Sequence, residues 1–219
     1  MSKIDKIKIA LLYFFLFAGG LWHFLNFFQT IMSYLAGPLL IGLSIWLYSE
    51  IKTNDKAKFF SKFDIWAIIV IIFSLFIEAI GVKTGQIFGK YNYGETLWPQ
   101  IMNVPIAIGF AWFLMLICSI ALMQRLPIIN NSIIWVQIFI ISILMTFFDF
   151  MMEPAAIKLN YWSWYKNTVP IQNYFAWFVI SFILMTLAWQ MKVLKLKFTK
   201  VVMHGYFAQL VYFIMITFK

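Results

Sequence analysis

Long apolar stretches separated by short polar connections make up most of this chain. A helix that rises about 1.5 Å per residue needs roughly 20 mainly apolar residues to cross the ~30 Å hydrocarbon core of a bilayer. Seven stretches meet this requirement, covering residues 7–28, 31–48, 64–82, 104–123, 132–152, 171–191 and 201–218. We therefore predict an all-α integral membrane protein of about seven transmembrane helices, forming a single polytopic domain over residues 1–219.

The composition supports the same class of protein, because hydrophobic residues make up 63% of the chain and charged residues 11%. A soluble domain of this composition could not cover its own surface with polar groups, so soluble proteins are excluded. Cys118 is the single cysteine and lies within an apolar stretch. It therefore indicates core packing and excludes a disulfide framework or a zinc cluster. The first stretch exceeds a signal-peptide core and lacks a small-residue cleavage site, so we expect an uncleaved helix.

Lysine and arginine gather on one side of this topology. The N-terminus and the connections after the second, fourth and sixth stretches hold 12 of the 17, namely Lys3, Lys6, Lys8, Lys52, Lys56, Lys58, Lys62, Arg125, Lys192, Lys195, Lys197 and Lys200. The other side holds the remaining 5, namely Lys83, Lys90, Lys158, Lys166 and Lys219. The positive-inside bias predicts a multi-pass protein of the cell (inner) membrane with a cytoplasmic N-terminus and an outer C-terminus. The net charge of +9 thus reflects topology, and we expect no nucleic-acid partner.

The two long connections that face outward, 83–103 and 153–170, belong to segments that resemble each other. The chain reads E-A-I-G-V-K from Glu78 and E-P-A-A-I-K from Glu153; it then reads V-P-I-A-I-G-F-A-W-F from Val104 and V-P-I-Q-N-Y-F-A-W-F from Val169. The helices of both copies run in the same directions, so we predict a parallel internal repeat of helices 3-4 and 5-6 about an axis along the membrane normal. Such a repeat would bring the two glutamates together near that axis.

Three acids lie at membrane depth near the outer face. Rise per residue places Glu78 roughly 21 Å and Asp149 roughly 24 Å from the inner boundary, and Glu153 shares a helical face with Asp149. An ionised carboxylate at this depth costs at least a few kcal/mol, so we expect the acids to face the bundle interior and at least one to be neutral. A neutral carboxylic acid is a potential proton donor. The alternative is a polar clamp between helices, closed by hydrogen bonds to Tyr, Trp or Lys83 and Lys158. The spacing suggests no metal site.

Aromatic residues are dense above these acids. We predict that the substrate-binding group comprises Tyr91, Tyr93, Tyr161, Trp162, Trp164, Asn173, Tyr174, Trp177 and His23. Part of this set is expected to form an interfacial belt, and a helix-packing hydrogen bond is an alternative for His23. Aromatic faces stabilise cations, so aromatics above a buried acid suit carbocation chemistry. Serine-hydrolase, zinc-protease, P-loop and CxxC motifs are absent, as is the lysine that a retinal protein needs in its last helix.

Four segments carry a resemblance to a known family: residues 78–94, 103–112, 149–164 and 169–178. With these segments the chain resembles the membrane-embedded CruF-type carotenoid 1,2-hydratases and the related bisanhydrobacterioruberin hydratases. The resemblance implies a cofactor-independent hydro-lyase that adds water across the terminal C1=C2 double bond of an acyclic ψ-end carotenoid such as γ-carotene or lycopene. It also implies that the partners of the protein are the lipid bilayer and other carotenoid enzymes with which it would associate.

The residues suggest how such a hydration would proceed. Asp149 is the expected acid, because the matching position of the other copy is Ser74, and Glu153 or Glu78 would take a proton from water. One alternative is an acid-catalysed carotenoid cyclase or isomerase, which uses the same protonation. Another is a membrane transporter or sensor of a small apolar ligand, with the acids as a proton relay.

Overall fold

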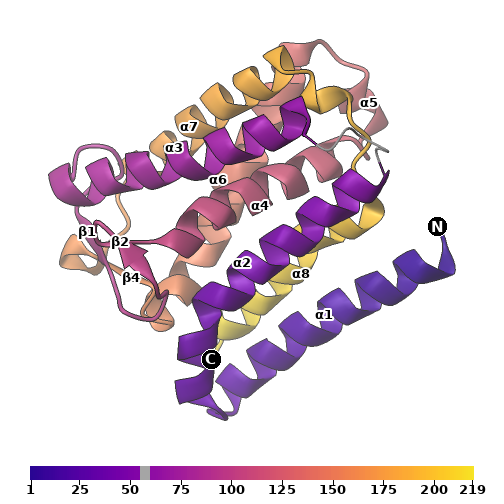
Figure 1. Cartoon of the computed structure of the whole chain (residues 1–219). Coiled ribbons are helices and arrows are strands. Elements are labelled where there is room, and N and C mark those ends of the chain that lie inside the picture. The colour runs from indigo at the N-terminus through magenta and orange to yellow at the C-terminus, as the bar shows by residue number, and fades with distance from the viewer. Residues whose placement is uncertain (55–59) are drawn as a thin grey trace.

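The computed structural model describes residues 1–54 and 60–219 and confirms the helical membrane class. Its helices are α1 (Lys3–Phe24), α2 (Gln29–Asn54), α3 (Lys62–Thr84), α4 (Ile106–Met123), α5 (Pro127–Asn130), α6 (Ile134–Lys158), α7 (Ile171–Gln190) and α8 (Lys200–Thr217) (Figure 1). Within these ranges, seven helices, all but the four-residue α5, are long and apolar enough to cross a membrane. Two of the expected inner lysines, Lys56 and Lys58, lie outside the described residues.

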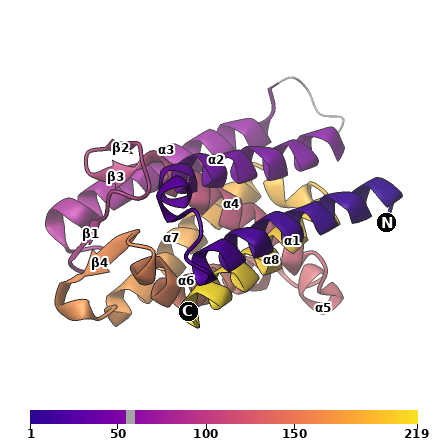
Figure 2. The ribbon, with the colours of Figure 1, turned by 90° about the horizontal axis from the view of Figure 1, so that it is seen from below.

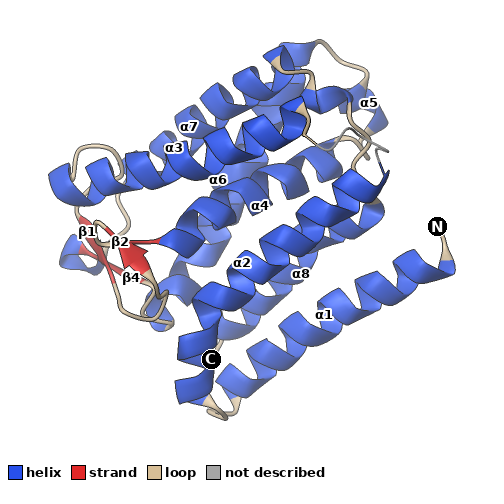
Figure 3. Ribbon diagram, viewed as in Figure 1, coloured by secondary structure: helices blue, strands red, loops and turns tan. Residues whose placement is uncertain are grey.

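Short strands lie in the connections at one end of the bundle (Figure 3). They are β1 (Tyr91–Tyr93), β2 (Gln100–Ile101), β3 (Val104–Pro105) and β4 (Trp162–Trp164), and two 3₁₀ turns cover Tyr165–Asn167 and Val193–Lys195. β1 pairs antiparallel with β4, so that Tyr91 lies opposite Trp164 and Tyr93 lies opposite Trp162. The connections 83–103 and 153–170, which are distant in sequence, are therefore joined by backbone hydrogen bonds.

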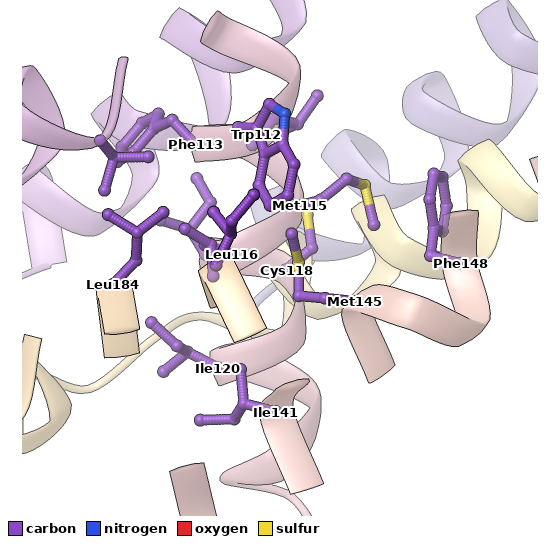
Figure 4. Packing of buried hydrophobic residues seen from close by; sticks show 14 of the residues in the cluster. Trp112, Phe113, Met115, Leu116, Cys118, Ile120, Ile141, Met145, Phe148 and Leu184 are labelled. Atoms are coloured by element: carbon purple, nitrogen blue, oxygen red, sulfur yellow. The ribbon is translucent and has the colours of Figure 1, made fainter. Parts of the chain in front are cut away.

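α4 is the central helix of the bundle and packs against α2, α3, α6 and α8. Its side chains are buried around most of its circumference, and Figure 4 shows Met115, Leu116 and Cys118 among residues from neighbouring helices. A helix that is apolar on all sides is suited to such a position. α8 approaches closely at Gly205, where a Cβ atom would lie 2.9 Å from the Cys118 sulfur. Cys118 is fully buried, which agrees with the predicted packing role.

The two ends of the bundle differ in chemistry. The N-terminus lies at the end of the bundle opposite the strands (Figure 2). At that end Lys8 pairs with Glu50 at 2.7 Å and Lys52 pairs with Asp64 at 2.8 Å. Asp64 also accepts the backbone N–H of Ser61, and this contact caps the first turn of α3. Glu50 and Asp64 are therefore paired with cations, whereas Glu78, Asp149 and Glu153 lie towards the strand end and are not in the ion pairs found among the described residues.

Candidate active site

A small cavity lies between the helices at the strand end and contains all three predicted acids. Glu78 comes from α3, and Asp149 and Glu153 come from α6; each is at most 4% exposed. The rest of the wall is almost entirely aromatic and aliphatic, with side chains from α2, α4, α7 and α8. The cavity offers about 70 Å³ to a water-sized molecule, which is room for a few waters. The sequence prediction that these acids face the bundle interior agrees with this arrangement.

Glu78 accepts hydrogen bonds from three aromatic side chains. The Tyr91 and Tyr93 hydroxyls both donate to Oε2, the latter at 2.8 Å, and the Trp112 indole donates to Oε1 at 3.0 Å. The pKa values of Tyr91 and Tyr93 are raised, mainly by burial and secondly by the nearby Glu78 carboxylate. Both phenols therefore keep their protons and remain donors. Gly81 makes room for the loop: a Cβ atom there would lie 2.7 Å from the ring of Phe88 and 3.3 Å from the Tyr91 hydroxyl.

Glu153 is held in a similar way by the other connection. Its Oε2 accepts the indole N–H groups of Trp162 at 3.0 Å and Trp164 at 2.9 Å. Both tryptophans belong to β4, whose alternate residues point to the same face. Its Oε1 has a longer contact of 3.5 Å with the amide of Asn173. One oxygen of Glu153 is therefore well satisfied and the other has spare accepting capacity.

Asp149 differs from both glutamates because one of its oxygens is free. Its Oδ2 accepts the Asn173 amide at 2.6 Å, whereas Oδ1 is buried and has no hydrogen-bond partner among the described residues. An unpaired buried polar atom in a native protein calls for an explanation. When this oxygen is protonated it can donate its proton to a molecule that enters the cavity, and when it is ionised it can accept one.

One half of the cavity comes from residues 78–112 and the other from residues 149–177, and the two halves share several features. Trp112 and Trp177 each lie eight residues after the valine of a V-P-I motif, and their rings stack at 3.9 Å with an angle of 16°. The β1–β4 pairing is centred on Asn92 and Ser163, so each half contributes an aromatic pair two residues apart. A parallel repeat would produce such pairings. The repeat itself stays a prediction.

Most of the predicted substrate-binding residues line the cavity, namely Tyr91, Tyr93, Tyr161, Trp162, Trp164, Asn173 and Trp177. His23 and Tyr174 are not among the lining residues. Nδ1 of His23 lies 3.3 Å from Oε1 of Gln29, and the His23 ring packs against the ring of Tyr212. These contacts fit the helix-packing alternative. The ring of Tyr174 packs against Phe150.

The sequence prediction missed Trp112, which both bonds to Glu78 and forms half of the central stack. Its place in the repeated F-A-W-F motif, equivalent to that of Trp177, was the signal that could have identified it. The clamp alternative named Tyr, Trp, Lys83 and Lys158 as partners of the acids. The aromatic part of that expectation agrees with the structure, because tyrosine and tryptophan side chains donate to Glu78 and Glu153. The lysine part does not. In the structure Lys158 donates instead to the backbone carbonyl of Thr217 at 2.7 Å, and Lys83 is exposed. Within the described ranges, no group of three or more His, Cys, Asp and Glu side chains is arranged to hold a metal.

The fold and the cavity define a helical membrane protein with a buried carboxylate and aromatic pocket near one membrane face. The chain belongs to the carotenoid biosynthesis protein family, whose model matches residues 29–218. It is also similar to the bisanhydrobacterioruberin hydratase of Haloarcula japonica, with 28% identity over 112 residues. That match covers 48% of this chain and 38% of the relative, so it spans well under half of the relative's length. No solved structure matches the chain. The resemblance noted in the sequence is thereby confirmed at the level of the family.

Proposed function

We propose that this protein is a carotenoid hydratase that adds water across the terminal C1=C2 double bond of an acyclic carotenoid end group. The observation that carries the proposal is the free, buried Oδ1 of Asp149 in a cavity whose wall is mostly aromatic and aliphatic. Membership of a carotenoid biosynthesis family and similarity to a protein named as a hydratase support it. Lycopene and γ-carotene are the proposed substrates, and the bilayer is their source.

The reaction begins with proton transfer from Asp149. Two acids one helical turn apart in a dry pocket repel each other when both are ionised, which favours a state in which the pair shares one proton. The O–H bond of Asp149 breaks and its proton adds to C2, while the π electrons form the new C–H bond. C1 is left as a tertiary cation. A general acid placed in this way typically contributes about 10²- to 10⁴-fold to a rate.

The second step is capture of the cation by water. The water oxygen bonds to C1, and one of its protons passes to Glu153, whose Oε1 has the longer and weaker contact. Glu78 is less suited to this role because both of its oxygens already accept hydrogen bonds. The proton then returns from Glu153 to Asp149. The net change is the addition of one water, so the chemistry requires no cofactor.

The aromatic wall has two roles in this scheme. Trp112 and Trp177 line the cavity that contains Asp149, and an aromatic face within about 6 Å of a cation stabilises it. The apolar wall also keeps bulk water from the acid before the substrate arrives. Because the empty cavity holds a few waters at most, an isoprenoid end group enters from the bilayer by displacing lining side chains. The proposed orientation places this site near the outer face of the cell membrane, with the N-terminus in the cytoplasm.

Expression in a bacterial host that makes lycopene tests the proposal. The wild-type protein is expected to convert lycopene into pigments heavier by one or two waters. Asp149→Asn and Glu153→Gln are expected to reduce this conversion at least 100-fold, and Asp5→Asn, which alters an acid of α1 outside the cavity, should leave it unchanged. Pigments of unchanged mass from a well-folded wild-type protein would refute hydration, and a new pigment of unchanged mass would indicate a cyclase or isomerase. Full conversion by Asp149→Asn would refute the assignment of the acid.

A further inference from the structure

The side-chain amide of Asn173 lies between the two acids of α6. Its Nδ2 is 2.6 Å from Oδ2 of Asp149 and 3.5 Å from Oε1 of Glu153. Asn173 is only 2% exposed, and its backbone N–H donates to the carbonyl of Pro170 at the start of α7. A primary amide nitrogen carries two N–H donors, and in this pocket an acid lies near each. The amide is therefore held in a fixed position against both carboxyl groups.

The other half of the cavity lacks this polar pair. Asn173 lies four residues after the valine of its V-P-I motif, and the same position of the other half is Ile108. Asp149 lies four residues before Glu153, and the residue four before Glu78 is Ser74. The Ser74 hydroxyl donates to the carbonyl of Val70 in its own helix at 2.7 Å. The acid and its amide are thus present together in one half and absent together from the other. This joint occurrence indicates that they act as a unit.

We propose that Asn173 is a positioning residue that fixes the acidic proton of Asp149 on Oδ1. The inference rests on the proposed hydratase function. Oδ2 receives the N–H of Asn173, and a carbonyl oxygen accepts such a bond better than a protonated oxygen does, so the O–H group belongs on the other oxygen. That oxygen, Oδ1, is the one that no described residue engages. The proton is therefore held where an incoming double bond can take it.

Loss of the amide changes proton transfer but leaves substrate contacts intact. Without the N–H donor the proton can occupy either oxygen, and the carboxyl group can rotate about its last bond. Small displacements of a reacting group reduce rates by up to about 10²-fold. We therefore expect kcat to fall about 10- to 100-fold while KM stays within about 2-fold. A purely structural role for Asn173 predicts instead that KM changes together with kcat.

The test uses purified full-length protein with lycopene in liposomes and compares Asn173→Leu with the wild type. Leucine has the same number and branching of side-chain heavy atoms as asparagine, although it is bulkier, and it has no hydrogen-bond donor. Gln172→Leu is the matched control, because it removes an exposed amide from the adjacent position of α7. The expected result is a kcat at least 10-fold lower for Asn173→Leu at an unchanged KM, with a fully active control. The thermal midpoint is expected to fall by only the roughly 2–4 °C that one lost hydrogen bond costs. An unchanged kcat would overturn the inference, as would a kcat loss matched by the control.

A second variant keeps the test decisive if Asn173→Leu does not fold. Asn173→Ile introduces the residue that the other half already packs at the equivalent position, Ile108. It is expected to show the same fall in kcat at unchanged KM, and retained kcat would overturn the inference. Failure of the proposed function gives a different result, since the wild-type protein itself would then form no hydrated product.

Discussion

Glu78→Gln is expected to destabilise the protein more than it affects the reaction. The glutamate accepts hydrogen bonds from Tyr91, Tyr93 and Trp112 and is 4% exposed. An indole N–H can only donate, so the oxygen of the new amide must face Trp112, and its NH₂ group then faces the two hydroxyls. Both hydroxyls lose their acceptor. At about 1 kcal/mol for each of the two lost hydrogen bonds, the substitution costs about 2 kcal/mol.

A loss of this size has a measurable effect on thermal stability. For a chain of this length, 1 kcal/mol corresponds to roughly 2–4 °C in Tm, so Glu78→Gln is expected to lower the midpoint in detergent by about 4–8 °C. The rate of hydration per folded molecule should stay within several-fold of the wild type, because Asp149 and Glu153 are unchanged. The assay combines thermal unfolding followed by tryptophan fluorescence with pigment turnover below the transition.

Glu95→Gln is the matched control, since it makes the same change at an exposed position of the connection that follows α3. It should alter neither the midpoint nor turnover. The reasoning would be refuted by a Glu78→Gln protein with a wild-type midpoint. A normal midpoint together with turnover reduced as strongly as in Asp149→Asn would show that Glu78 takes part in proton transfer.

Two further predictions follow from the aromatic wall. Trp177→Leu removes one face of the stack with Trp112, and loss of a cation–π contact of about 0.5–2 kcal/mol predicts a fall in kcat of about 2- to 30-fold; unchanged turnover would contradict the role given to this face. The raised pKa of Tyr91 and Tyr93 predicts stability that is fully present below about pH 10, the pKa of the unfolded phenol, and lost as pH rises further. Unfolding followed from pH 7 to 11 checks this, and a Tyr91→Phe, Tyr93→Phe protein with the same alkaline loss would argue against it.

The number and order of the membrane helices could be predicted from the sequence because the bilayer sets a minimum length for each apolar run. The first and last residues of the helices were less predictable, because local polar contacts determine where a helix begins and ends. The first helix begins at Lys3 and not at residue 7, because Ser2 and Asp5 form a capping box within the lysine-rich start. The fifth predicted stretch ends at residue 152, but α6 continues to Lys158 through Pro154.

The acids of the site could be predicted because a charged residue in an apolar run is rare and has to be buried in the bundle. The contacts that distinguish the acids could not be predicted. The β1–β4 pair joins two connections about 70 residues apart, and strands of three residues are too short for their alternation to be recognised. Tyr174 was placed in the site with Asn173, but consecutive residues of a helix face different directions, so its ring lies against Phe150.

Incorporation of labelled water tests the central claim most directly. Purified protein in liposomes containing lycopene would be incubated in water enriched in the heavy isotope of oxygen, and the pigments would be analysed by mass. The account predicts a hydroxylated product that carries the heavy oxygen, formed by the wild type and at least 100-fold more slowly by Asp149→Asn. Lycopene recovered unchanged, or converted to an isomer without labelled oxygen, by a well-folded protein would contradict it.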